Sequence, residues 1–268
     1  MIIDSHAHLF LKDFDADRDA VIRRAGDSGV TCMVNTAIDL RSSYRVVEMA
    51  YANPAMPAVV GLHPHSVSDF NSHNMGLLED LSDHPQVVAI GEIGLDYYRS
   101  ADDRPEQLSL LKTMLELAAC RNLPVILHCR SAEEDMRSVI RQWARETPAC
   151  RGKWRGVRHC FGGDLSTARF YLEMGFMLSF GAYIGYPSAA GLADVINRLP
   201  EEALLVETDC PYLPPQRYRG KRNEPSYLPY TANILAEVRN STPEDIARIT
   251  STNACLLFGL DRPVRPDR

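Results

Sequence analysis

The sequence lacks the features that mark disulfide-stabilised, secreted and membrane-spanning proteins. Its seven cysteines include no CxxC pair, and an odd number of thiols scattered over 268 residues is not typical of a disulfide framework. No run approaches the roughly 18 apolar residues of a membrane-spanning helix, and the N-terminus has no basic segment followed by an apolar stretch. We therefore expect a cytoplasmic protein with reduced thiols and no membrane partner.

An excess of positive charge is also missing. The formal net charge is −6, so no overall positive field attracts nucleic acid, and a polyanion must be held by a local basic patch or by metal. With 45% hydrophobic and 24% charged residues, the composition is that of an ordinary globular protein. We predict one domain over residues 1–260 and a flexible tail over 261–268, with no obligate protein partner evident.

Short apolar runs alternate along the chain with segments of helical period, which predicts parallel strands joined by crossover helices. A helix is predicted over 107–120, where Leu108, Leu111 and Leu115 share one face. Eight such units predict a TIM barrel, an α/β fold whose catalytic groups lie at the C-terminal ends of the strands. The strand-like runs are 2–6, 30–36, 58–62, 87–92, 125–128, 156–159, 177–180 and 204–207.

Two helix starts carry capping signals. Thr242 followed by Pro243 predicts an N-cap with proline at the first helical position, before a last helix over 243–257. Ser131 and Glu134 have the spacing of a capping box, which predicts a helix start after the fifth run.

Metal-binding side chains follow several of these runs. In His6-Ala7-His8 the spacing of two directs both imidazoles to one side, where a single ion can bind them. Alone, this motif is weak, because a surface or hydrogen-bonded pair of histidines has the same spacing. Recurrence strengthens it, since His128, His159 and Asp209 also stand at the ends of apolar runs. These residues predict a metal centre at one mouth of the barrel.

Glu92 ends the fourth run, and Gly91 and Gly94 beside it leave room for close approach of backbone or ligand. An ordinary salt bridge is the alternative for this carboxylate. In many barrel metallohydrolases a carbamylated lysine bridges two ions at the corresponding place. The only lysines are Lys12, Lys112, Lys153 and Lys221, and none lies on a predicted strand. Glu92 is therefore the natural bridging ligand, with one oxygen for each ion.

Three cysteines directly follow proposed ligands: Cys129, Cys160 and Cys210. Consecutive side chains on a strand point to opposite faces, so we expect these thiols to be directed into the layer between strands and helices. They are interpreted as buried structural thiols rather than ligands.

Five motifs together resemble the TatD family of metal-dependent hydrolases, and the resemblance covers nearly the full chain. They are DSHAH (4–8), GLHPH (61–65), GEIGLDYY (91–98), HCFGG (159–163) and ETDCPYL (207–213). The resemblance implies one ion at His6, His8, Glu92 and Asp209. It implies a second at Glu92, His128 and His159.

Further residues are candidates for substrate binding. The resemblance favours a substrate-facing role for His65, although His63 and His65 are equally compatible with supporting or structural roles. The segment 217–225, RYRGKRNEP, supplies four cations after the eighth run, where barrels commonly bind phosphate, but it also fits a solvated loop. The predicted substrate-binding set is His63, His65, Arg99, Arg219, Lys221 and Arg222.

Two ions lower the pKa of a bound water toward about 7 and stabilise both oxygens of a displacement at phosphorus. Asp209 can bind metal and orient or deprotonate that water, because a carboxylate keeps its second oxygen free, and Glu92 is the other predicted catalytic residue. Four imidazoles and two carboxylates leave Zn²⁺, Mn²⁺ and Mg²⁺ open. The resemblance implies a deoxyribonuclease, a 3′–5′ exonuclease-type phosphodiesterase on DNA or RNA ends. A carbonyl-directed hydrolase, such as a D-aminoacyl-tRNA deacylase, is the alternative.

Overall fold

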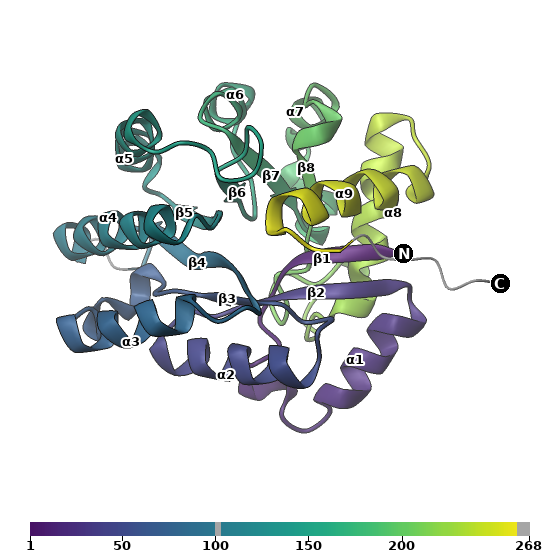
Figure 1. The fold of residues 1–268 in the computed structure, drawn as a ribbon. Coiled ribbons are helices and arrows are strands. Elements are labelled where there is room, and N and C mark those ends of the chain that lie inside the picture. Colours follow the sequence, from purple (N-terminus) through teal and green to yellow (C-terminus); the bar gives the residue numbers. More distant parts are fainter. Residues whose placement is uncertain (100–102, 262–268) are drawn as a thin grey trace.

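The computed structural model describes residues 1–99 and 103–261, and its centre is one sheet of eight parallel strands in sequential order (Figure 1). All eight predicted strands are present. Their bounds are β1 Ile2–Ala7, β2 Val30–Thr36, β3 Ala58–Val60, β4 Val87–Asp96, β5 Val125–Arg130, β6 Gly156–Arg158, β7 Phe176–Phe180 and β8 Leu204–Val206.

Helices surround this sheet, which gives the predicted TIM barrel (Figure 1). The α-helices are α1 Arg18–Asp27, α2 Leu40–Ala52, α3 Ser72–Ser82, α4 Arg104–Arg121, α5 Glu133–Glu146, α6 Leu165–Glu173, α7 Leu192–Asn197, α8 Leu228–Arg239 and α9 Pro243–Phe258. Within residues 1–99 and 103–261, no helix is both long and apolar enough to cross a membrane.

The C-terminal end of β1 and the residue after it are hydrogen-bonded to the segment that follows β8. Asp209 N donates to His6 O at 3.0 Å, and His8 N donates to Cys210 O at 3.0 Å. Inside the ring, each strand contributes one buried apolar side chain, and Leu257 and Phe258 of α9 pack against this layer. The eight are Ile3, Val34, Val59, Ala89, Ile126, Val157, Met177 and Leu205. The interior is thus a packed core, and the strand ends at the opposite mouth are held rigidly.

Strand β4 continues four residues beyond the predicted end at Glu92. Gly94 permits this, because a Cβ at that position would lie 1.8 Å from the carbonyl oxygen of His128 on β5. The backbone of Gly94 also has φ +153°, which side chains rarely adopt. The extension pairs Asp96 with Arg130 and brings a further carboxylate to the mouth of the barrel.

The two capping predictions have different outcomes. Thr242 caps α9 as predicted, because its hydroxyl accepts a hydrogen bond from Asp245 N. The capping box at Ser131 is wrong. Helix α5 begins after Ala132 with no side-chain cap, and Ser131 has φ +55°. Of the predicted tail, 262–268 lies outside the described residues.

Candidate metal centre

The structure brings the six predicted ligands together at the C-terminal mouth of the barrel. His128 and His159 lie two residues beyond the inward-facing Ile126 and Val157, so strand alternation directs both imidazoles inward. On β1, strict alternation from Ile3 would point His6 outward. The β1–β2 pairing shifts register between Asp4 and Ala7, and such an irregularity re-aims side chains toward the mouth.

The first group of donor atoms consists of His6 Nε2, His8 Nε2, Glu92 Oε2 and Asp209 Oδ1. The two imidazole nitrogens are 3.1 Å apart, and each lies 3.3 to 3.6 Å from both carboxylate oxygens. Metal–ligand bonds of about 2.0–2.1 Å give tetrahedron edges of about 3.3–3.4 Å. The spacing therefore fits one tetrahedrally coordinated ion.

The second group is built on the other oxygen of Glu92. Glu92 Oε1 lies 2.8 Å from His128 Nδ1 and 2.8 Å from His159 Nε2, and these two nitrogens are 3.3 Å apart. His63 Nε2 is 3.8 Å from the same oxygen, so a residue assigned to substrate binding is also placed as a possible fourth ligand. Glu92 thus presents one oxygen to each group, which is the arrangement of a bridging carboxylate.

Supporting contacts orient several of these ligands. His8 Nδ1 donates to the carbonyl oxygen of Thr36 at 2.7 Å, which fixes the tautomer and leaves Nε2 as the electron-pair donor. Asp96 Oδ2 lies 3.0 Å from His65 Nε2 and 3.4 Å from His128 Nε2. A carboxylate behind a metal-binding histidine holds the ring and raises its basicity.

Three supporting carboxylates were not predicted as site residues from the sequence. Asp96 stands four residues after Glu92, a spacing that marks the same strand face once β4 is known to continue. Glu207, fully buried, accepts hydrogen bonds from Cys160 N and from the Ser179 hydroxyl. Asp4 accepts bonds from Thr208 N at 2.9 Å and from Thr208 Oγ1 at 2.6 Å, and burial raises the pKa of Asp4 to about 7.

The electrostatics of the mouth favour bound cations. Burial acts to raise the pKa of Glu92, but the surrounding histidines, His159 first among them, hold that pKa well below its usual value. The pKa of Asp209 is lowered for similar reasons, against the effect of its burial. Buried ionised carboxylates are stable only when paired or coordinated to metal. The donor set therefore fits divalent ions.

The backbone around Asp209 adopts an uncommon conformation. Its φ is +54°, in the left-handed region that residues other than glycine adopt uncommonly. The side-chain amide of Asn223 donates to Thr208 O at 2.8 Å and to Tyr212 O at 2.7 Å, which ties the segments on both sides of Asp209 together.

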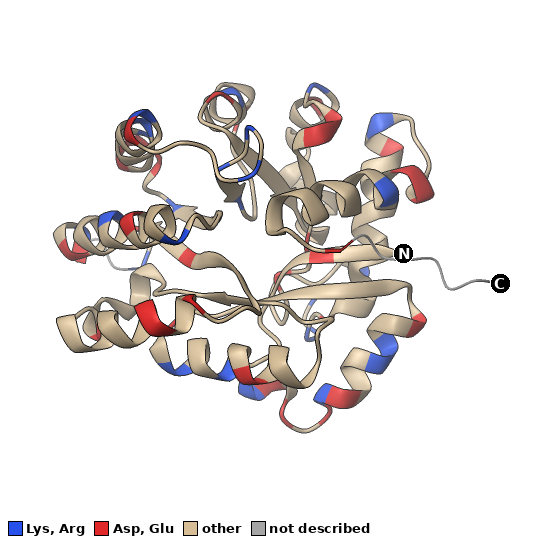
Figure 2. Ribbon diagram, in the orientation of Figure 1, with Lys and Arg blue, Asp and Glu red and all other residues tan. Residues whose placement is uncertain are grey.

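A cavity of about 570 Å³ opens over the two donor groups. His63, His65 and Arg99 line it, together with five of the six predicted ligands. Arg130, Arg158, Asp96 and Tyr212 also contribute to its wall, although none was predicted as a site residue. Figure 2 shows charged residues of both signs interspersed over the outer helices. At this mouth, Arg99, Arg130 and Arg158 contribute positive charge to the cavity wall.

The three predicted substrate-binding cations of the segment after β8, Arg219, Lys221 and Arg222, lie outside the cavity wall. Arg222 does not line the cavity. Its guanidinium forms two 2.8 Å contacts with the carboxylate of Asp17 and lies over the ring of Phe14. Arg219 and Lys221 are exposed and stand outside the cavity wall, with Arg219 over the ring of Tyr186. The pairing of Arg222 joins the segment after β8 to the start of α1.

The three cysteines that follow proposed ligands, Cys129, Cys160 and Cys210, differ in their surroundings. Cys210 is buried as expected, and the thiol of Cys129 is directed toward the helix layer as expected, where it donates to Glu133 of α5, whereas Cys160 contributes to the cavity wall, which corrects its predicted orientation. Strand β6 ends at Arg158, and a φ of +48° at Cys160 breaks the alternation on which the prediction rested. None of the three belongs to a potential metal-binding cluster in the described residues. Burial raises the pKa of Cys129 to about 12, so its thiol stays protonated.

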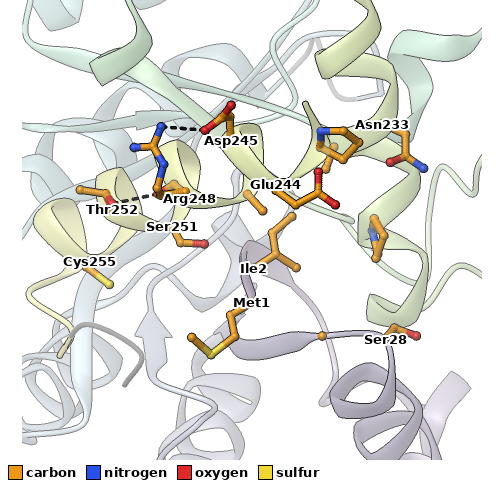
Figure 3. A pocket seen from close by; sticks show the side chains of 15 residues that line it. Met1, Ile2, Ser28, Asn233, Glu244, Asp245, Arg248, Ser251, Thr252 and Cys255 are labelled. Carbon is orange, nitrogen blue, oxygen red and sulfur yellow. Dashed lines mark hydrogen bonds and ion pairs between the residues drawn. The ribbon is translucent and has the colours of Figure 1, made fainter. Parts of the chain in front are cut away.

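A second cavity, of about 660 Å³, lies at the opposite end of the barrel between Met1–Ile2, α8 and α9 (Figure 3). Arg248 there pairs with Asp245 at 3.0 Å, and the lining residues include no histidine. Residues at this end of a TIM barrel usually serve stability. The chemistry is therefore assigned to the C-terminal mouth.

Comparison with known proteins identifies the family. The family model described as TatD related DNase matches residues 3–259. The chain belongs to the TatD family. It is therefore a metal-dependent hydrolase acting on ester bonds, as the motifs predicted.

Several TatD relatives match along almost their full lengths. The chain is 37% identical to the uncharacterized metal-dependent hydrolase YabD of Bacillus subtilis, over 97% of this chain and 100% of YabD. It is 32% identical to the 3′-5′ ssDNA/RNA exonuclease TatD of Erwinia billingiae, over 97% and 99% of the two chains. The crystal structure of YjjV, a TatD homologue from Escherichia coli, superposes with a TM-score of 0.89 at 30% identity, covering 97% and 98%.

Proposed function

We propose that this TatD protein is a two-metal exonuclease that removes nucleotides from the 3′ ends of single-stranded DNA or RNA. The observation that carries the proposal is Glu92, with Oε2 among the nitrogens of His6 and His8 and Oε1 between those of His128 and His159. Relatives named as 3′-5′ ssDNA/RNA exonucleases, at about a third identity, support this substrate class over an aminoacyl ester.

The proposed metal ligands are His6, His8, Glu92 and Asp209 for one ion and Glu92, His128 and His159 for the other. Zn²⁺, Mn²⁺ and Mg²⁺ are the candidate ions. When bound, two such ions lower the pKa of a water molecule and stabilise charge on the attacking and leaving oxygens.

The residues of the chain then have separate tasks. Hydrolysis adds water across one P–O bond, so a proton must leave the water and another must reach the leaving oxygen. Asp209 directs Oδ1 toward His6 and His8, which leaves Oδ2 to orient the water and accept its proton. His65 and Arg99 line the cavity, and we assign them contacts with the phosphate.

A direct assay tests this function. The purified protein is incubated with Mg²⁺, Mn²⁺ or Zn²⁺ and with 5′-labelled single strands, duplexes and an aminoacyl-tRNA. We expect labelled products that become shorter by one nucleotide at a time. A blocked 3′ end should stop the reaction. Faster release of the amino acid than of any nucleotide would overturn the proposal in favour of a carbonyl-directed hydrolase.

The exposed cations of the segment after β8 give a further prediction. In the double variant Arg219→Ala with Lys221→Ala, we expect KM for a single strand to rise more than kcat falls, because these contacts exist in ground and transition states alike. With about 0.7 counterions released per phosphate, the slope of log affinity against log salt should become shallower by about 1.4. An unchanged slope would mean that the segment is a solvated connection.

Replacement of Arg222 should affect stability rather than substrate binding. Its pairing with Asp17, at 2.8 Å for both oxygens, makes it a structural residue, so Arg222→Ala should lower Tm and leave the salt slope unchanged. Thermal unfolding and binding measured on the same samples separate the two effects. A large change in the salt slope with an unchanged Tm would return Arg222 to the substrate-binding set.

A further inference from the structure

Arg158 is a buried guanidinium with an unusual set of partners. The residue is 7% exposed, stands at the end of β6 and contributes to the cavity wall. It donates to the carbonyl oxygens of His159 and Cys129, while its Nε is buried without a hydrogen-bond partner. Its hydrogen-bond partners are neutral carbonyl oxygens, the nearby carboxylate of Glu133 favours its positive charge, and an anion in the cavity would add a further partner for this buried cation.

Arg130 is another arginine of the cavity wall. It follows His128 by two residues on β5, so its side chain leaves the strand on the same side as that imidazole. Its guanidinium carbon lies 3.8 Å from the centre of the Tyr98 ring, and this stacking braces a side chain that is otherwise exposed. Arg158 Nη2 donates to the carbonyl oxygen of Cys129, the residue just before Arg130, so the two arginines belong to neighbouring strand ends.

The charges of the cavity wall leave these cations available for substrate. The carboxylates that line the cavity are Glu92, Asp96 and Asp209, and each is in contact with histidines. The arginines on the wall, Arg99, Arg130 and Arg158, therefore add positive charge beside the second donor group. Guanidinium forks match phosphate oxygens in geometry as well as in charge.

We propose that Arg130 and Arg158 form a second phosphate subsite, which holds the phosphodiester next to the one being cleaved. This inference rests on the proposed function and deepens it. The preferred substrate would then contain at least two phosphodiesters, the one that is cleaved and the one next to it. The β5–β6 side of the cavity would determine this preference.

The test compares a trinucleotide, which has two phosphodiesters, with a dinucleotide, which has one, under saturating Mn²⁺. The readout is the ratio of kcat/KM for the two substrates. Hydrogen bonds to charged groups are worth enough to give the wild type a preference of about tenfold or more for the trinucleotide. Arg130→Ala should reduce this preference to about threefold or less, and Arg130→Lys should restore part of it.

Controls separate this role from a structural one. Arg198→Ala, just after the end of α7, where the arginine pairs with Asp194, makes the same change in net charge and should keep the wild-type ratio. Arg158→Met should also lower the ratio, with Tm and bound metal measured on the same sample. Should Arg158→Met fail to fold, the exposed Arg130 variants decide the question.

The outcomes distinguish the inference from the function on which it rests. A wild type that cleaves neither substrate with any ion overturns the exonuclease proposal and the subsite with it. A wild type that cleaves both without preference, or an Arg130→Ala variant that keeps the wild-type ratio or slows both reactions equally, overturns the subsite alone.

Discussion

Replacing Asp209 by asparagine should lower kcat by about 10²–10⁴-fold while KM changes little, because the variant would lose the group that we propose orients and deprotonates the water. The amide keeps an oxygen where Oδ1 now faces His6 and His8 at 3.6 and 3.3 Å, so the metal contact is retained in large part. Steady-state kinetics with saturating divalent ion measure the effect.

Metal content must be determined on the same Asp209→Asn sample. An equal loss of bound metal and of activity would assign Asp209 to metal binding alone. A kcat near the wild-type value with both ions bound would remove Asp209 from the mechanism.

Glu92→Gln should have a still larger effect, since a neutral amide cannot bridge two cations as the carboxylate does. The change affects both donor groups, in which Glu92 oxygens lie 2.8 to 3.5 Å from His6, His8, His128 and His159. We expect at most one ion to remain bound. Loss of one electrostatic contact lowers the rate by about 10²–10³-fold, and we expect kcat/KM of this variant to fall by more than that. Elemental analysis and kinetics on one preparation measure both quantities.

The exposed Glu202, which pairs with Lys153 at 3.3 Å, offers a matched control for Glu92→Gln. Glu202→Gln removes the same charge far from the mouth and should keep metal content and activity. If Glu92→Gln bound two ions with wild-type affinity, Glu92 would not be the bridging group.

The fold was predictable because its signals are local. Each strand is recognisable in the sequence as a short apolar run. Parallel strands in sequential order bring all their C-terminal ends to one mouth of the barrel. His128 and His159 could therefore be placed together from sequence, although 31 residues separate them. Glu92 was recognisable for the same reason, helped by the absence of lysine from the predicted strands.

The remaining features depend on contacts that no local pattern encodes. The pairing of Arg222 with Asp17 joins residues 205 positions apart, and a basic run gives no sign that one member is already neutralised. Asp96 was missed because Glu92 marked the end of the predicted strand, whereas Gly94 lets β4 pass the carbonyl of His128 and continue. The turn at Cys160 required a left-handed backbone at a residue other than glycine, which sequence patterns do not predict.

The measurement that tests the central claim most directly is a divalent-ion titration of chelator-treated protein, with bound metal and activity determined on the same samples. We predict two equivalents per chain for the wild type, with activity rising as the sites fill, and one equivalent for His6→Ala with His8→Ala in a folded protein. Absence of bound metal together with no activation by Mg²⁺, Mn²⁺ or Zn²⁺ would contradict the account.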